Sequence, residues 1–244
     1  MRPTNFLIII IISCFSYSQE KTYNFDYVLE YENNNNIDST GSIKSYVFVN
    51  SKDNSFVLTY TDYRDHGYLR FLHHNAARIS TKMDNKLFFA AESIRLGCGF
   101  QTKMAYHKKT FKWHSFKIEK DTIIKNDTLK YYTYNAYNKK KKRSWRSKHL
   151  GHHFIIQPNT EHILPFFYST NTYDKWKVSK DLPKGIFRRN YFLTKKGAIG
   201  EGDFRLLSVT KYKKQIILPV KSCSKQIADR IIAQKQLEKI LNNN

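Results

Sequence analysis

The histidines in the middle of the chain are the first residues whose spacing could support chemistry. A zinc site needs three or four converging ligands. His152 and His153 are adjacent and lead into the apolar run Phe154–Ile156, which predicts a strand, so their side chains should point to opposite faces and cannot both bind one ion. The cationic segment before them would also repel a metal. His149, His152 and His162 remain as metal candidates, and we expect no metal and no other cofactor.

Other catalytic patterns are absent from the sequence. Glu161 beside His162 has the composition of an acid–base pair, but neighbouring residues in a strand face apart. Gly197, Gly200 and Gly202 lack the spacing of a phosphate-binding loop. No GxSxG, HExxH or calcium-loop motif occurs. The sequence therefore names no catalytic residue, and a hydrolase with an unrecognised metal or histidine site is an alternative only.

A run of five cations precedes the histidines: Lys139, Lys140, Lys141, Lys142 and Arg143. Two interpretations stay open. The run could contact an anionic surface such as lipid or lipopolysaccharide, or it could be a solvated hairpin tip. The net charge of +22 favours anionic partners, but the abundance of Lys, Asn, Ile, Tyr and Phe is also typical of AT-rich coding sequences.

The first 18 residues predict export. Arg2 is followed by the apolar run Phe6–Phe15, and small residues precede a cut between Ser18 and Gln19. The run would span about 15 Å of a core about 30 Å thick, so it is too short to anchor the chain. The alternative is acylation of Cys14 in a lipobox-like context. We expect the protein in the periplasm or at the outer-membrane periphery, where a nucleic-acid partner is not expected.

Two cysteines remain after residue 18, at Cys98 and Cys223. In an oxidising compartment a pair far apart in sequence predicts a disulfide. Closing a loop of about 125 residues would stabilise the fold by about 4–5 kcal/mol in the chain-entropy model.

Alternation of apolar and polar residues is the main structural signal. Phe25, Tyr27, Leu29 and Tyr31 are expected on one face of a strand, with charged residues between them. Similar runs predict strands over 43–50, 55–61, 68–73, 77–83, 86–96, 111–120, 129–137, 154–157, 161–164, 176–180, 186–194, 204–212 and 216–220, with a turn at 158–160 between two of them. The segment 68–79 could also be a short helix, and 86–96 is similarly ambiguous; turn residues beside both favour strands.

These elements predict one mainly β domain over residues 19–244. We expect a single curved antiparallel sheet, like half of a barrel, with a C-terminal α-helix over about 224–241. Residues 216–220 would form the last strand, and the apolar arc of the helix should pack on the sheet.

Several segments also resemble a group of uncharacterised exported β-rich proteins of Gram-negative bacteria. They are the opening Phe25–Glu32, the turn Asn50–Ser55, the return Asp121–Ile124 and the turn Leu182–Ile186. In overall pattern this group is similar to the lipoprotein-carrier (LolA-like) half-barrels. The resemblance implies a curved sheet that wraps an apolar ligand, and it transfers no functional residues.

The sequence thus favours a non-enzymatic envelope protein that binds an amphiphile on its concave face. The 17 Phe and 17 Tyr residues could line a ligand cavity or form a packed core. A basic surface protein that binds anionic lipid or lipopolysaccharide is the second alternative. The ligand and the oligomeric state stay open.

Overall fold

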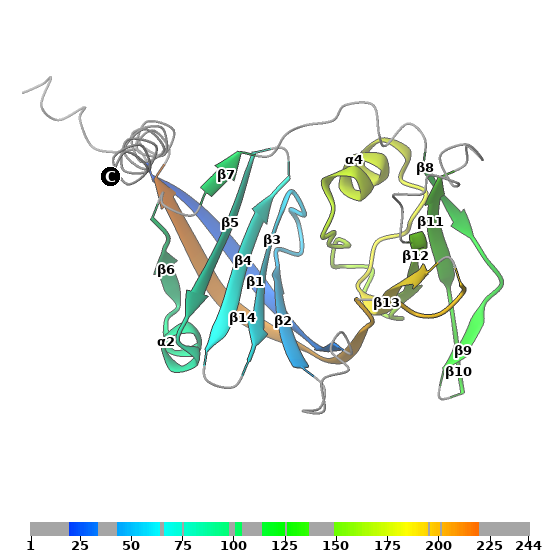
Figure 1. The fold of residues 1–244 in the computed structure, drawn as a ribbon, viewed down its shortest axis with the longest axis horizontal. Helices are drawn as coiled ribbons and strands as arrows, with labels where there is room; N and C mark the ends of the chain where they lie inside the picture. Colours follow the sequence, from blue (N-terminus) through cyan, green and yellow to red (C-terminus); the bar gives the residue numbers. More distant parts are fainter. Residues whose placement is uncertain are drawn as a thin grey trace, which may run out of the picture.

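One 12-stranded sheet dominates the computed structural model (Figure 1). The structure describes residues 20–33, 43–63, 66–74, 76–97, 101–103, 114–124, 126–136, 149–194, 196–200 and 202–219. The strand order is β7-β5-β4-β3-β2-β1-β14-β13-β12-β11-β8, with β6 paired to β14 outside this path. Every pair is antiparallel except β6 with β14. The predicted class, a mainly β fold with one large antiparallel sheet, is confirmed. The predicted C-terminal helix lies outside the described residues.

The strands are β1 (Glu20–Asn33), β2 (Ile43–Val49), β3 (Phe56–Asp62), β4 (Gly67–His73), β5 (Ala77–Met83), β6 (Ser93–Arg95), β7 (Gln101–Lys103), β8 (His114–Ile118), β11 (Tyr131–Ala136), β12 (His149–Ile156), β13 (Phe187–Thr194) and β14 (Phe204–Pro219). A separate hairpin pairs β9 (Thr122–Ile124) with β10 (Asp127–Leu129). The helices are α2 (Asn85–Ala90) and α4 (Thr170–Ser179). Within the described segments, no helix has the length and apolar character needed to cross a membrane.

The sheet is bent into two groups of strands. In Figure 1, β2–β5 stand on one side, β11–β13 stand on the other, and α4 lies between them. The long strand β14 runs from the first group to β13 in the second. Strands β1 to β5 pair antiparallel in sequence order and form a meander.

A register shift in β1 divides its aromatic residues between two cores. The shift lies between Phe25 and Tyr27 in the pairing with β14. Tyr23 and Phe25 therefore belong to one core, whereas Leu29 and Tyr31 belong to another. The expectation that Phe25, Tyr27, Leu29 and Tyr31 share a face is wrong. Opposite the single residue Asp26 of β1, β14 has two residues, and this β-bulge changes the face that β1 presents on either side of Asp26.

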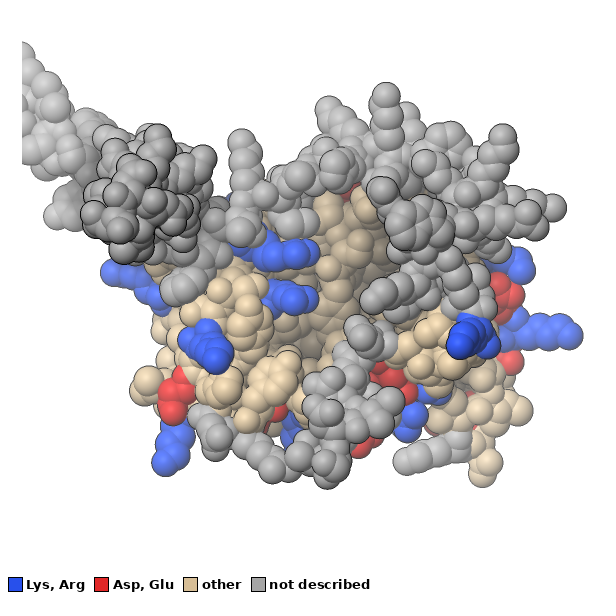
Figure 2. Space-filling view, viewed as in Figure 1, with Lys and Arg blue, Asp and Glu red and all other residues tan. Residues whose placement is uncertain are grey.

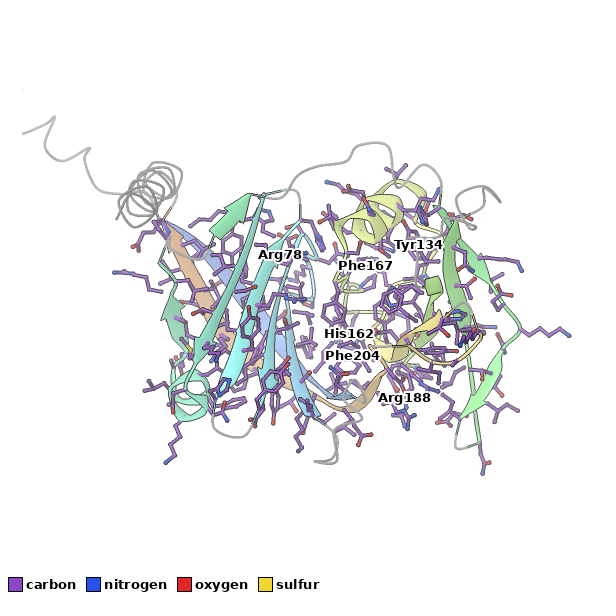
Figure 3. The ribbon with its side chains drawn as sticks, viewed as in Figure 1. Arg78, Tyr134, His162, Phe167, Arg188 and Phe204 are labelled. Carbon is purple, nitrogen blue, oxygen red and sulfur yellow. The ribbon has the colours of Figure 1, made fainter. Side chains whose placement is uncertain are left out.

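The first core joins the two groups of strands through the segment around α4. Its buried members are Leu29, Tyr31, Val47, Val49, Val57, Leu72, Phe116, Tyr132, Tyr134, Phe154, Ile156, Ile163, Phe166, Phe167, Tyr173, Trp176, Leu182, Ile186, Phe187 and Leu206. Figure 3 labels Phe167 and Phe204 between the two groups. Rings that could have lined a ligand cavity are therefore packed against each other in this region.

The second core lies on the opposite face of β2–β4 and is covered by α2. Its buried members are Tyr23, Phe25, Phe48, Phe56, Leu58, Tyr60, Leu69, Phe71, Ile79, Phe88, Ile94, Leu96, Ile216 and Leu218. Phe88 of α2 stacks on Tyr60 with ring centroids 3.7 Å apart. The prediction of a strand over 86–96 is wrong for the residues that form α2 and is confirmed only for Ser93–Arg95, which form β6. Asp84 caps the helix, since its carboxylate accepts the Leu87 amide hydrogen (3.0 Å).

Two further predicted strands are wrong. Residues 176–180 belong to the end of α4, where Tyr173 and Trp176 are buried three residues apart and Val178 is exposed. Lys180 ends the helix with φ of 56°. After β12, residues 161–164 form turns instead of a strand, because the Ile163 amide donates to Thr160 O (2.9 Å) and the Gly185 amide donates to Ile163 O (2.9 Å).

A buried carboxylate joins the two groups of strands at the β13–β14 crossing. These strands pair only through Arg189 with Arg205 and Asn190 with Phe204. Asp203, 3% exposed, accepts from Arg189 Nε (2.7 Å) and from Arg205 Nη2 (3.1 Å). Burial alone would raise the pKa of Asp203, but the hydrogen bonds and charges of the two arginines lower it overall.

Replacing Asp203 with Asn should destabilise the fold by about 2–3 kcal/mol at pH 7, because the arginines lose their shared anion. The carboxylate has a lowered pKa in the folded state, so its stabilising contribution is present above about pH 4 and is lost as pH falls through the folded pKa. Urea unfolding at pH 7 and pH 3 should show a difference between wild type and Asp203→Asn that shrinks at the lower pH. A difference that stays constant with pH would contradict this role.

A buried lysine holds α2 against the sheet. Lys214 is 1% exposed, and its Nζ donates to Phe88 O (2.7 Å) and Ala91 O (2.6 Å) at the end of α2. The ammonium also lies 4.4 Å from the Phe88 ring centroid. Burial lowers the pKa of Lys214 to about 8.

Because the unfolded state keeps this proton to about pH 10.4, it binds more protons than the folded state between pH 8 and 10.4. Stability contributed by this group therefore rises with pH in that window. We expect wild type to gain about 2 kcal/mol relative to Lys214→Met between pH 7.5 and 9.5 in chemical unfolding. The same pH dependence in both proteins would show that Lys214 is not the titrating group.

Candidate functional site

A pocket of about 790 Å³ opens beside α4 and is the candidate site. It lies between the turn that joins β2 to β3 and the segments before and after α4. Its lining residues are Ser51, Lys52, Asn54, Glu161, His162, Leu164, Tyr173, Trp176, Lys177, Lys180, Leu182, Pro183 and Lys184. We call it the lysine pocket.

Side-chain hydrogen bonds fix the β2–β3 turn that forms one wall. Asn50 Oδ1 accepts the amide hydrogens of Lys52 (2.9 Å) and Asp53 (3.0 Å), which is the geometry of an Asx turn. The Asp26 carboxylate accepts from the Ser51 amide (2.8 Å) and from its hydroxyl. The Leu164 amide donates to Ser51 O (3.1 Å). These contacts fix the turn that carries Lys52 and tie it to the segment before α4.

The second wall is the C-terminal half of α4 and the turn that follows. Trp176 is 4% exposed and its Nε1 donates to Leu182 O (2.9 Å), which folds the turn back on the helix. Tyr173 stacks on His74 with centroids 4.2 Å apart. Burial, followed by the charge of His73, lowers the pKa of His74 to about 3. Tyr173 and Trp176 thus form an apolar floor held by neutral, buried groups.

Four lysines surround this floor: Lys52, Lys177, Lys180 and Lys184. Lys180 Nζ lies 3.6 Å from the Trp176 ring centroid, and Lys177 Nζ lies 5.9 Å from that of Tyr173. Within the described residues, none of the four has a carboxylate within 4.0 Å. Burial, with the charges of Lys177 and Lys184, lowers the pKa of Lys180. The ammonium groups repel each other, so an anion among them would be attracted strongly.

The net positive charge alone does not distinguish this pocket from the rest of the surface. Figure 2 shows Lys and Arg side chains scattered over the visible face of the described residues. The lysine pocket differs from such surface because its cations share one concave floor of aromatic and aliphatic side chains. The single carboxylate in its lining is Glu161.

The structure separates the predicted metal candidates. His149 lies at the start of β12, and His152 is 7% exposed and stacks on Phe192 with centroids 4.0 Å apart. His153, on the other face of β12, contacts Tyr131 and Tyr191. Over the described residues, no group of three or more His, Cys, Asp or Glu side chains is placed to hold a metal ion.

The neighbouring Glu161 and His162 both line the lysine pocket. The His162 ring is exposed and lies 5.9 Å from that of Tyr27. No hydrogen bond joins Glu161 to His162 among the bonds of the described residues, so the structure gives no support to an acid–base pair.

Other predicted sites lie outside the described residues. They are the cleavage site at Ser18 and Gln19, the lipobox cysteine Cys14, the Cys98–Cys223 disulfide and the cations Lys139 to Arg143. Each of them stays a prediction.

Sequence reasoning missed the lysine pocket. The one available signal is local: Trp176 and Lys180 are four residues apart, which places them on one face of a helix. An interpretation of 176–180 as a strand concealed that relation. The contribution of Lys52 has no sequence signal, because the turn that carries it is far from α4 along the chain.

A scan against protein-family models finds no match to this sequence. A search of curated proteins also finds no match. Among solved structures, the chain is similar to MucB at 10% identity and a TM-score of 0.32, over 82% of this chain. It spans 57% of the length of that MucB chain.

Two further structures are similar at comparable levels. A domain assigned to outer membrane lipoprotein sorting from Vibrio parahaemolyticus is 8% identical with a TM-score of 0.32, and the match covers 84% of this chain and 91% of that one. A DUF1329 family protein from Desulfovibrio piger is 7% identical with a TM-score of 0.29, covering 89% and 92%. Similarities at these TM-scores assign no function to this chain.

Replacing Trp176 with Leu should destabilise the protein by about 2–4 kcal/mol, because it removes a buried ring and the hydrogen bond to Leu182 O. Val178 on the same helix is 72% exposed, so Val178→Ala is a matched control that should change stability by less than about 0.5 kcal/mol. Urea unfolding monitored by circular dichroism measures both. Equal stability of Trp176→Leu and wild type would contradict the proposed structural role of the floor.

Proposed function

We propose that this protein is a non-enzymatic binding protein of the bacterial envelope that takes an anionic amphiphile in the lysine pocket. The observation that carries the proposal is the set of four lysines without carboxylate partners, in the described part of the chain, over a floor of buried apolar side chains. A ligand with both an anionic group and an apolar chain satisfies both features at once.

The size of the pocket fits a single-chain amphiphile. Sites for small organic ligands commonly enclose about 300–1,000 Å³, and this one measures about 790 Å³. Tyr173, Trp176 and Leu182 are buried in the first core, so an apolar chain laid over them would cover a rigid surface. Little conformational entropy would then be lost on the protein side.

The charges favour an anion over a neutral headgroup. Lys177 and Lys180 lie near the C-terminus of α4, where the helix dipole offers partial compensation. Lys52 and Lys184 lie on turns outside the helix and have no such compensation. An anionic group between the two walls would relieve the repulsion that contributes to the lowered pKa of Lys180.

Isothermal titration with dodecyl phosphate, dodecyl maltoside and inorganic phosphate, each below its micelle concentration, tests the proposal. Dodecyl phosphate should bind most tightly, because only this probe offers both the charge and the chain. Raising the salt concentration should weaken its binding. Lys177→Gln combined with Lys180→Gln should weaken dodecyl phosphate about tenfold and leave dodecyl maltoside unaffected.

The matched control is Lys82→Gln with Lys120→Gln, which removes two exposed lysines outside the pocket. It should leave dodecyl phosphate binding unchanged. Equal affinities for dodecyl phosphate and dodecyl maltoside, or an equal loss in the control variant, would reject the lysine pocket as an anion-selective site.

A further inference from the structure

The outer edge of β14 is unpaired over its middle. On one side β14 pairs with β1 from Phe204 to Pro219. On the other side it pairs with β13 at Phe204 and Arg205 and with β6 at Gln215–Ile217. Between these two contacts, no other strand of the described chain joins this side of β14. Figure 1 shows β14 as the long strand that links the two groups of strands.

Side-chain exposure agrees with this gap in the pairing. The five successive residues Leu207–Lys211 are all exposed. Because successive side chains point to opposite faces, neither face of this stretch is covered. Leu207 is 50% exposed and Val209 is 38% exposed. Directly across the ladder, Leu29 of β1 is fully buried. We call Leu207–Lys211 the open edge.

The space beside the open edge has defined ends. At one end the Asp203 carboxylate holds β13 and β14 together. At the other, Tyr212 donates to Phe89 O (3.1 Å) and Lys214 holds the end of α2. An extended peptide of five or six residues, about 17–20 Å long, would match a gap of this length. Unpaired backbone groups on an edge are the usual template for such strand addition.

We propose that the open edge binds an extended acidic peptide by strand addition. Lys211 on the edge and Lys213 beside it are exposed cations, and the whole chain carries a net charge of +22. Acidic side chains on an incoming strand would pair with these lysines across the ladder. The exposed Leu207 and Val209 would contact apolar residues at alternate positions of the peptide.

A second copy of this chain fits the open edge less well. An antiparallel pair of β14 strands centred on Val209 would set Lys213 of one copy opposite Arg205 of the other. Like charges directly opposite each other are destabilising. The net charge of +22 on each copy opposes self-association as well. Charge therefore selects an acidic partner.

The probe is the fluorescent hexapeptide Glu-Thr-Glu-Thr-Val-Thr, called the Glu–Val peptide, measured by anisotropy with the full chain. In an antiparallel pair its two Glu residues lie opposite Lys213 and Lys211 and its Val lies opposite Val209, because opposed residues share one face of the ladder. Wild type should bind it about tenfold more tightly than Lys211→Glu combined with Lys213→Glu. The double variant should instead prefer the same peptide with both Glu residues replaced by Lys. Methylation of alternate backbone nitrogens of the Glu–Val peptide should abolish binding, because strand addition needs those donors.

Lys82→Glu with Lys120→Glu makes the same charge change at exposed positions elsewhere and should leave the affinity within about twofold. An equal loss in this control would show non-specific charge attraction and overturn the proposal. Unchanged binding of the methylated peptide, no binding of the Glu–Val peptide, or dimerisation of the free protein through β14 would each overturn it too. Dodecyl phosphate does not enter this experiment, so its outcome is independent of the lysine pocket.

Discussion

The antiparallel pairing of β1 with β14 is the constraint on which the rest of the structure depends. These are the two longest strands of the described chain, and they pair from Glu20 with Pro219 to Asn33 with Phe204. Residues from both strands enter both cores. The bulge in β14 opposite Asp26 makes this possible, because the apolar side of β1 faces the second core before Asp26 and the first core after it. Without the bulge, the apolar side chains of β1 would pack into only one of the two cores.

Two buried ionic side chains connect β14 to the elements beside it, one to β13 and the other to α2. Asp203 lies where β14 meets β13 and accepts hydrogen bonds from two arginines. Lys214 lies where β14 meets α2 and donates to helix-end carbonyl groups. Each compensates its own burial with two or more partners, as buried charges require. β14 pairs with β13 through only two residue pairs and with β6 through only three. Asp203 and Lys214 therefore help to fix these neighbours in place where few backbone hydrogen bonds do.

The lysine pocket follows from how the first core is closed. The segment from residue 157 to residue 186 crosses the space between the two groups of strands and contributes Ile163, Phe166 and Phe167 to the core. Its apolar side is used for packing, and its cationic side remains at the surface around Trp176. The aromatic residues thus form a filled core, and the space available to an amphiphile lies at the margin of that core.

The amino-acid sequence by itself determined the fold class and most strands. Alternation over short windows is a local property, so β1–β5, β13 and the turn at Leu182–Gly185 could be predicted from neighbouring residues. It also implied that His152 and His153 face apart, since that depends only on the pleat of one strand. The bulge opposite Asp26 of β1 and the helix α4 could not be predicted in this way. Both depend on tertiary contacts. Phe25 and Tyr27 alternate with polar residues as in a regular strand, so the sequence does not mark the bulge. Trp176 lies on the side of α4 that packs in the first core.

The candidate site was decided only by the tertiary structure. Lys52 and Lys180 belong to segments that are far apart in the sequence, and neither segment carries a motif. They meet because the Leu164 amide binds Ser51 O and because Trp176 binds Leu182 O. The open edge of β14 is equally a property of the assembled sheet, since exposure along a strand depends on which neighbours end before it does. Local patterns record the period of an element, whereas sites form where distant elements are brought together by packing.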